Sequence, residues 1–178
     1  MRFYSTKGNT ISVGFKDALF HGLAPDGGLY MPEAIPHLGT DYFKSDLSFP
    51  ELATGMIHPF TKDDLTHARL TDICELAFDF PLRIKELNET DSVLELFHGP
   101  TFAFKDFAAR FMARAMSYFL ENKDNEITIL VATSGDTGSA VANGFFNVDG
   151  INVIILYPSN RVSAIQEKQL TTLGGNIT

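Results

Sequence analysis

The chain has 178 residues, of which 44% are hydrophobic and 20% are charged, so it can bury a core as one large or two small domains. Its formal net charge of −8 argues against a protein that tracks a nucleic-acid backbone or an anionic membrane, because both need a basic surface. The composition favours a globular protein whose partner is a small molecule.

Residues 1–80 have the composition of a helical domain interrupted by loops. Ser12 is placed to cap a short helix, and Gly22 is a suitable C-terminal stop for it. Further along, Thr61 and Asp64 resemble a capping box at the start of a second helix. We therefore assign 1–80 to a mostly helical N-terminal domain.

Short extended segments and longer helices alternate after residue 80. Segments 82–87 and 92–97 flank a turn composition and predict a β-hairpin. An amphipathic helix follows, because four apolar residues recur at every fourth position, while Arg110 and Arg114 fall on a face that should be solvated. The four apolar residues are Phe107, Phe111, Ala115 and Phe119.

Two β-α units complete the pattern. Their strands are expected at 127–132 and 151–157, and their helices at 138–146 and 163–173. Apolar strands joined in this way form a parallel sheet that is covered on both faces through right-handed crossovers. The sequence thus predicts an α/β fold in which 81–178 is an incomplete parallel-sheet domain, because Thr178 comes where a third strand would begin.

The turn after the strand at 127–132 is a candidate anion site. Its sequence is TSGDTG (133–138), and glycines there let backbone N–H groups converge at the positive end of a helix. Asp136 would repel a dianionic phosphate, so we expect a carboxylate held by Ser134, Thr137 and nearby amides. A plain tight turn is the alternative. The spacing does not match the phosphate loops of ATP or NAD proteins, or the elbow of serine hydrolases.

Lys105 is the candidate nucleophile. It falls at the expected start of the amphipathic helix, among aromatic residues, where burial and the positive helix end would both lower the pKa of an amine. Asp106 should oppose this by favouring the charged form. An ordinary surface lysine is the alternative. His98, in a turn before this helix, either orients a phosphate or hydrogen-bonds the backbone.

Cys74 is the only cysteine, which excludes an internal disulfide and a cysteine-based metal site. It falls in an apolar stripe, as a small buried residue does. The histidines lack the spacing of metal ligands, so we expect no metal. Because no apolar run is long enough to span a membrane and the first residues do not resemble a secretory signal, we predict a cytoplasmic protein.

Two segments of the chain are especially distinctive: ELFHGPTFAFKDF at 95–107 and ATSGDTG at 132–138. Both closely resemble the threonine synthase family. Further similar segments are GLAPDGGLYMP at 22–32, ILYP at 155–158, QEK at 166–168 and LGGN at 173–176. The resemblance covers essentially the whole chain.

The resemblance implies an enzyme of fold type II that uses pyridoxal 5'-phosphate. Lys105 would carry this cofactor as an internal aldimine, with Phe104 and Asp136 also in the cofactor site. In the family, the cradle for the cofactor phosphate lies beyond the position of Thr178. The 178-residue chain by itself is therefore expected to be inactive.

The implied reaction converts O-phospho-L-homoserine and water to L-threonine and phosphate. Ser134, Gly135 and Thr137 would bind the substrate, chiefly through its carboxylate. The freed lysine would move protons while phosphate leaves Cγ and water adds at Cβ. The expected partner is thus a small-molecule substrate, with neither nucleic acid nor membrane involved.

Two other functions are compatible with these residues. Another fold type II lyase, such as threonine dehydratase or a cysteine-synthase-like enzyme, also uses a lysine and a carboxylate-binding loop, but the long N-terminal segment argues against it. A non-catalytic, threonine-synthase-like protein that binds anions is the second alternative, and in that protein Lys105 would be incidental.

Overall fold

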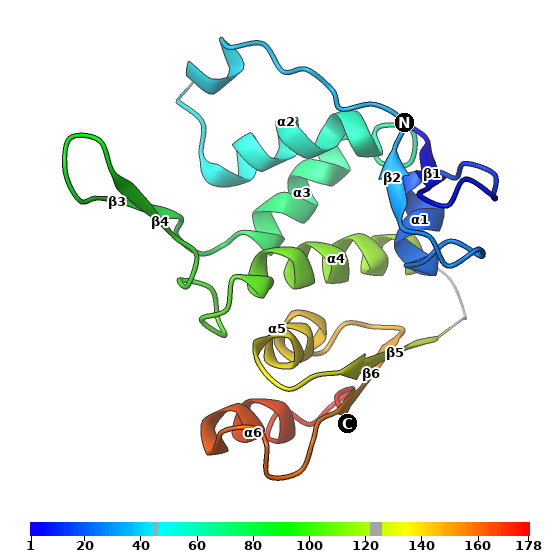
Figure 1. The fold of residues 1–178 in the computed structure, drawn as a ribbon, viewed down its shortest axis with the longest axis vertical. Coiled ribbons are helices and arrows are strands. Elements are labelled where there is room, and N and C mark those ends of the chain that lie inside the picture. Colours follow the sequence, from blue (N-terminus) through cyan, green and yellow to red (C-terminus); the bar gives the residue numbers. More distant parts are fainter. Residues whose placement is uncertain (45, 122–125) are drawn as a thin grey trace. The chain divides into compact units, whose positions relative to one another are not determined.

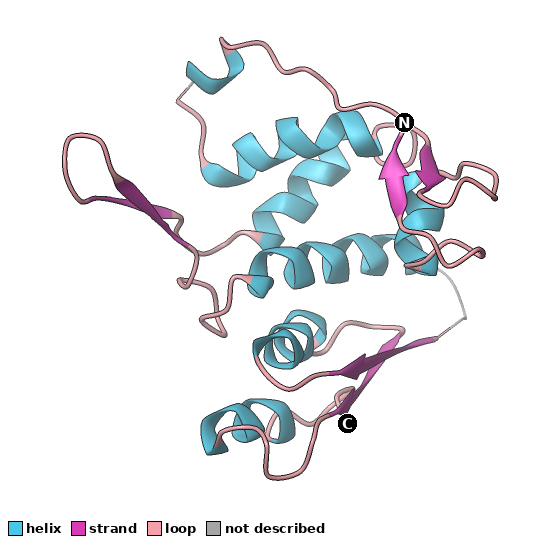
Figure 2. Ribbon diagram, viewed as in Figure 1, coloured by secondary structure: helices cyan, strands magenta, loops and turns pink. Residues whose placement is uncertain are grey.

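The structure is a computed structural model that describes residues 1–44, 46–121 and 126–178, and it divides into two compact units, 1–75 and 76–178. Figure 1 follows the elements along the chain, and Figure 2 distinguishes helices from strands. The mixture of helices and small sheets confirms the predicted α/β class. Within the described ranges, no helix is long and apolar enough to cross a membrane.

The first unit combines helices with a small antiparallel sheet. Its elements are β1 (Phe3–Ser5), α1 (Phe15–His21), β2 (Tyr30–Pro32), the 3-10 helix η1 (Tyr42–Lys44), α2 (Phe49–Thr61) and most of α3 (His67–Ala77). β1 and β2 pair with Tyr4 opposite Met31. A helical region was predicted here, but β1, β2 and α2 were not.

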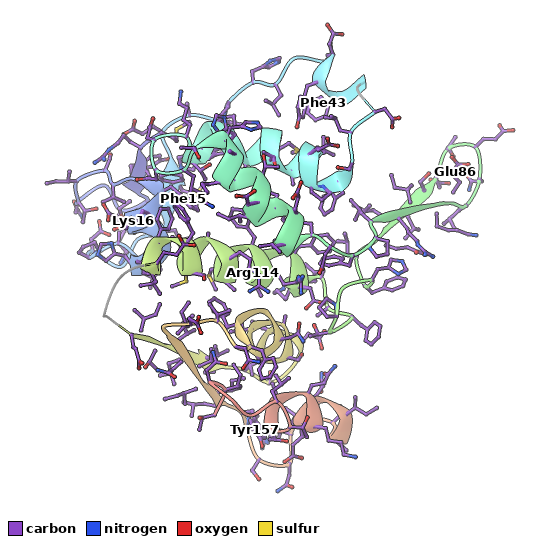
Figure 3. All side chains as sticks on the ribbon, turned by 180° about the vertical axis from the view of Figure 1, so that it is seen from behind. Phe15, Lys16, Phe43, Glu86, Arg114 and Tyr157 are labelled. Carbon is purple, nitrogen blue, oxygen red and sulfur yellow. The ribbon has the colours of Figure 1, made fainter. Side chains whose placement is uncertain are left out.

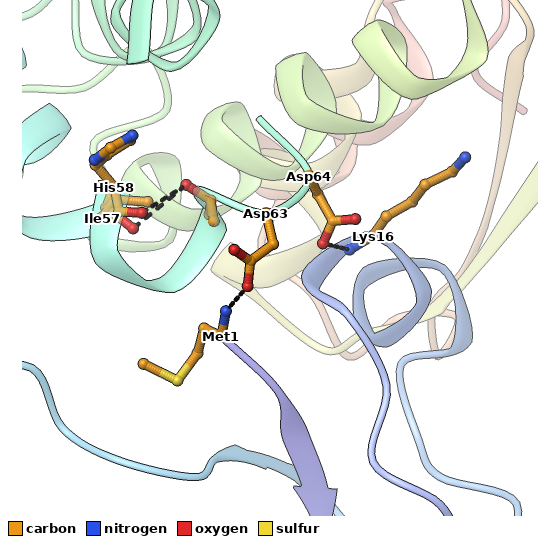
Figure 4. A network of polar contacts seen from close by, with 7 residues as sticks. Met1, Lys16, Ile57, His58, Asp63 and Asp64 are labelled. Atoms are coloured by element: carbon orange, nitrogen blue, oxygen red, sulfur yellow. Dashed lines mark hydrogen bonds and ion pairs between the residues drawn. The ribbon is translucent and has the colours of Figure 1, made fainter. Parts of the chain in front are cut away.

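Helix α2 begins with a capping box. The Ser48 hydroxyl accepts from the Glu51 N–H, and the Glu51 carboxylate accepts from the Ser48 N–H at 2.8 Å. Thr61 is the last residue of this helix, and its hydroxyl donates to the Ile57 carbonyl (Figure 4). The predicted capping box at Thr61 and Asp64 was therefore wrong.

Asp64 instead caps α1, which is distant in sequence. Its Oδ2 accepts from the Lys16 N–H at 3.3 Å (Figure 4), and a Cβ on Gly14, the N-cap of α1, would lie 2.9 Å from the same atom. Ser12 was therefore wrongly predicted as the cap. Gly22 ends α1 with a φ of +69°, as predicted.

His58 and His67 form a ring pair between α2 and α3, with centroids 5.0 Å apart. Burial lowers the pKa of His58, and the nearby charges of His67 and Lys62 lower it further. The folded state thus favours the neutral ring. Stability from this group is complete above the ordinary histidine pKa of about 6.5, and it is lost as pH falls below that value.

We therefore expect the thermal unfolding midpoint of the chain to fall on acidification from about pH 7.5 to about pH 5.5. In the His58→Phe variant the fall should be smaller, because the ring at that position no longer binds a proton. Circular dichroism melts at both pH values measure the effect. Equal falls in wild type and variant would show that the ring pair does not contribute.

The second unit contains a hairpin and the two predicted β-α repeats. Its elements are β3 (Arg83–Glu86), β4 (Ser92–Glu95), α4 (Lys105–Leu120), β5 (Ile127–Ala132), α5 (Asp136–Phe145), β6 (Ile151–Leu156) and α6 (Ala164–Thr171). β3 and β4 form the predicted antiparallel hairpin. β5 and β6 pair in parallel, and Ile177 forms a further parallel bridge to Val153. The parallel sheet and the beginning of a third strand are thus confirmed.

Less exposed and more exposed residues alternate along β5, and every second residue of β6 is buried. Val153 and Ile155 are buried, whereas Leu130 and Leu156 are more than half exposed. In the part of the chain that the structure describes, one face of this small sheet is therefore open. The apolar strands had predicted a sheet with both faces covered. Helix α5 packs closely against α4, because a Cβ on Gly144 would lie 3.1 Å from the backbone of Ala109.

Arg110 is buried within α4, where a solvated side chain was predicted. Its Nε donates to the Ala77 carbonyl at 2.8 Å, and its Nη2 donates to the Leu76 carbonyl at 2.8 Å and to the Asp79 carboxylate at 2.6 Å. Arg114 (Figure 3) is half-buried, and its Nε has no acceptor among the described residues. The apolar periodicity located this helix correctly but not the role of its arginines.

Candidate functional site

Lys105 is the first residue of α4, as predicted, and Phe104 is the N-cap. The Nζ of Lys105 lies 3.4 Å from the centroid of the Phe104 ring, which is a cation–π contact. No hydrogen bond or ion pair is found for this amine within the described ranges. Among the described residues, no carboxylate therefore pairs with the Lys105 amine.

Asp106 does not pair with its neighbour. Its carboxylate is fully buried and accepts hydrogen bonds from Thr101, at 2.6 Å from the hydroxyl and at 2.9 Å from the backbone N–H. We had expected Asp106 to favour the charged form of Lys105. Instead, the Asp106 carboxylate binds Thr101 in the loop that precedes α4.

The loop before Lys105 has an unusual backbone and exposed aromatic rings. Phe102 has a φ of +61°, which a residue with a side chain rarely adopts. Phe97, Phe102 and Phe104 are each more than half exposed. His98 contacts the Glu95 carboxylate through Nε2 at 2.6 Å, and no backbone partner of this ring is found among the described residues.

The turn between β5 and α5 is organised by Thr133. Its hydroxyl donates to the Gly135 carbonyl at 3.1 Å and accepts from the N–H groups of Gly135 and Gly138 at 3.2 and 3.1 Å. A Cβ on Gly138 would lie 2.3 Å from the Thr133 methyl group. Two of the amides that we expected to meet an anion are therefore used by the turn itself.

The remaining polar groups of this turn are available to a ligand. Ser134 and Thr137 are exposed, and neither hydroxyl has a partner among the described residues. The N–H groups of Asp136 and Thr137 lie in the first turn of α5, where a helix offers no acceptor. A Cβ on Gly135 would find no atom closer than 3.7 Å, so the turn is open on that side. Two hydroxyls and two amides at a helix N-terminus can together bind a carboxylate.

Asp136 is held by a residue from the next helix. The Gln166 side chain donates to its Oδ1 at 3.1 Å, while the same side chain accepts from the Ser163 N–H at 3.2 Å as part of a capping box. Gln166 thus connects the starts of α5 and α6. The Ser163-to-Gln166 spacing is readable in the sequence, but its link to Asp136 is not.

The candidate residues thus lie at the starts of two helices of one unit. Lys105 and Phe104 begin α4, and the turn at 133–138 begins α5, which packs against α4. In Figure 1 both helices start on the left-hand side of this unit. That the Lys105 amine faces the turn remains a prediction.

Sequence reasoning missed the roles of Thr133 and Asp106. Thr133 was recognised only as part of a polar turn, and a hydroxyl directly before a glycine-containing helix start could have indicated a cap. For Asp106, only the effect of its negative charge on Lys105 was considered. An acid in the first turn of a helix that follows a Gly-Pro-Thr turn could have suggested a bond back to that turn.

Comparison with known proteins gives a consistent result. The family described as threonine synthase N terminus matches residues 2–78. The threonine synthase of Haemophilus influenzae is 44% identical over 99% of the chain, and that of Escherichia coli is 38% identical over 99%. The chain covers 41% of each, so it spans about two fifths of the length of the curated relatives that it matches.

Solved structures agree with the sequence matches. A structure described as PLP-bound threonine synthase from Brucella melitensis has a TM-score of 0.90 at 38% identity, over 96% of this chain and 38% of that chain. Threonine synthase from Escherichia coli has a TM-score of 0.89, over 99% of this chain and 41% of that chain. Over nearly its whole length, the chain is thus similar in sequence and in fold to the N-terminal part of threonine synthases.

Proposed function

We propose that the complete protein, as its organism makes it, is a threonine synthase that depends on pyridoxal 5'-phosphate. It would convert O-phospho-L-homoserine and water to L-threonine and phosphate in the cytoplasm. We also propose that 1–80 is the N-terminal domain of the family and that 81–178 is the first part of the cofactor domain. The match at 2–78 and the division of the chain after Glu75 support these boundaries.

The observation that carries this proposal is the state of Lys105. A lysine that binds an aldehyde cofactor needs an amine that is free of carboxylate partners and held in place. Here Lys105 is the first residue of α4, and its amine lies against the Phe104 ring and has no ion pair within the described residues. An ordinary surface lysine would extend into solvent without such a contact.

The residues of this chain fit the cofactor and the substrate. Lys105 would hold pyridoxal phosphate covalently, with Phe104 and Asp136 also in the cofactor site. Ser134, Gly135 and Thr137 would bind the substrate carboxylate, for which the turn offers unpaired hydroxyls and amides.

Each of these groups has a chemical task in the proposed reaction. When bound, pyridoxal phosphate supplies an electron sink for negative charge at the carbon atoms next to the substrate amine. The Lys105 amine would take and return protons at those carbon atoms. The turn at 133–138 would orient the substrate through its carboxylate, and Gln166 would keep the Asp136 carboxylate in place.

Product analysis of the complete protein tests this function. We expect release of phosphate from O-phospho-L-homoserine, with formation of threonine in equal amount. Release of ammonia from threonine or serine in place of phosphate would instead indicate a dehydratase. A protein that performs neither reaction but binds carboxylates would fit the non-catalytic alternative.

A further inference from the structure

We propose that Asp106 is a positioning residue, whose buried carboxylate fixes the loop at 99–104 and thereby the Lys105 amine. The inference rests on the proposed function of Lys105. Asp106 is 0% exposed, and a carboxylate is almost never fully buried unless its oxygens are paired. The hydrogen-bond donors to the Asp106 carboxylate therefore indicate which segment this side chain fixes.

Both carboxylate oxygens bind the loop through one residue. Oδ1 accepts from the Thr101 hydroxyl at 2.6 Å, and Oδ2 accepts from the Thr101 N–H at 2.9 Å. Hydrogen bonds to a charged acceptor are about twice as strong as neutral ones. The position of Asp106 in the first turn of α4 also stabilises its negative charge. Thr101 is thus fixed to the start of the helix at two points.

The backbone of the loop closes around this carboxylate. A Cβ on Gly99 would lie 2.4 Å from Asp106 Oδ2, so only glycine allows the chain to approach so closely. The Phe102 N–H donates to the Gly99 carbonyl at 3.1 Å, and the Asp106 N–H donates to the Ala103 carbonyl at 3.0 Å. These contacts make 99–106 one hydrogen-bonded turn around a buried charge.

Strain in the loop explains why such a fixed point is needed. A φ of +61° at Phe102 is unfavourable for a residue other than glycine, and it persists only where the surroundings hold it. Thr101, the residue directly before, is the one that Asp106 binds. Two residues after Phe102, the Phe104 ring lies against the Lys105 amine. Relaxation at Phe102 would therefore displace this ring and the amine.

Asp106 acts through the loop and not through direct charge, because no ion pair joins it to Lys105. This distinction identifies the useful variants. Asp106→Asn places an amide opposite two donors, and Thr101→Val removes the hydroxyl while keeping the shape of the side chain. Thr101→Ser keeps the hydroxyl, so this variant should hold the loop and fix the cofactor as wild type does. Asp17→Asn is a matched control, since Asp17 is an exposed acid in the first turn of α1.

The experiment uses the complete protein and two readouts. Amide hydrogen exchange of peptides that cover 99–104, without cofactor, reports on the loop. Borohydride reduction after addition of pyridoxal phosphate, followed by peptide mass spectrometry, reports the fraction of cofactor fixed at Lys105. We expect Asp106→Asn and Thr101→Val to speed the exchange and to lower cofactor fixation at least about tenfold. Thr101→Ser and Asp17→Asn should resemble wild type in both.

The outcomes separate this proposal from the proposed function. If wild type fixes no cofactor at Lys105, the function proposed for that residue fails, and exchange still reports whether Asp106 holds the loop. If both disruptive variants fold and fix cofactor within about twofold of wild type, the positioning role is overturned. Should Asp106→Asn fail to fold, the comparison of Thr101→Val with Thr101→Ser decides the question.

Discussion

Replacement of Lys105 with alanine is expected to lower the turnover of the complete protein by at least about a thousandfold. The variant lacks both the covalent attachment point for pyridoxal phosphate and the amine that moves protons. The fold should change little, because no hydrogen bond or ion pair of the Lys105 amine is found among the described residues. Steady-state assays of phosphate release, together with thermal melts, measure both effects.

Lys85→Ala provides the matched control for this experiment. Lys85 is an exposed lysine on β3 of the hairpin, so its removal takes away the same chemical group from a different surface. We expect its turnover to equal that of wild type. A Lys105→Ala variant that retains turnover within about tenfold of wild type would contradict the assignment of the cofactor lysine.

Replacement of Arg110 with methionine is expected to lower the free energy of unfolding by about 2–4 kcal/mol. Methionine keeps the length of the apolar stem but removes all three donated hydrogen bonds. The carbonyls of Leu76 and Ala77, at the end of α3, would then lose their partner, and Asp79 would lose its counter-charge. Urea denaturation followed by circular dichroism gives the difference.

Arg83→Met is the control for the loss of an arginine as such. Arg83 is exposed on β3, and a surface substitution of this kind usually changes stability by less than about 0.5 kcal/mol. Equal losses at positions 83 and 110 would falsify the view that burial makes the difference. A loss confined to position 110 would support the hydrogen-bonding role of that guanidinium.

The second unit was largely predictable because its signals are local. The apolar run at 127–132 gave the strand without error, and the four-residue period at 107–119 gave helix α4. Lys105 was correctly placed at a helix start, because a polar residue after a Gly-Pro turn and before an amphipathic period marks such a start. These features depend on neighbours within a few residues of one another.

The first unit was less predictable because long-range contacts determine it. β1 and β2 have three residues each, and their pairing joins segments more than twenty residues apart, which no local period reveals. Asp64 was read as part of a local cap, although it caps α1 across a sequence separation of 48. The cap of α2, in contrast, was present as Ser48 and Glu51 and was overlooked.

In the candidate site, too, some residues could be identified from the sequence, whereas the roles of others depend on the fold. Ser134, Thr137 and Lys105 could be selected because their chemistry is evident from their type and position. The hydroxyl of Thr133 and the carboxylate of Asp106 serve the backbone, and their partners follow only from the folded turn. A polar side chain that is satisfied internally looks the same in a sequence as one that awaits a ligand.

The hairpin of β3 and β4 has little buried surface. All but one of its strand residues are exposed, among them Ile84, Val93 and Leu94, and an isolated two-stranded hairpin is at best marginally stable in water. Its folding equilibrium is therefore weakly coupled to the core of the second unit. Opening of this segment on a fast timescale would leave global cooperativity unchanged, so a melting curve would not register whether the hairpin is formed.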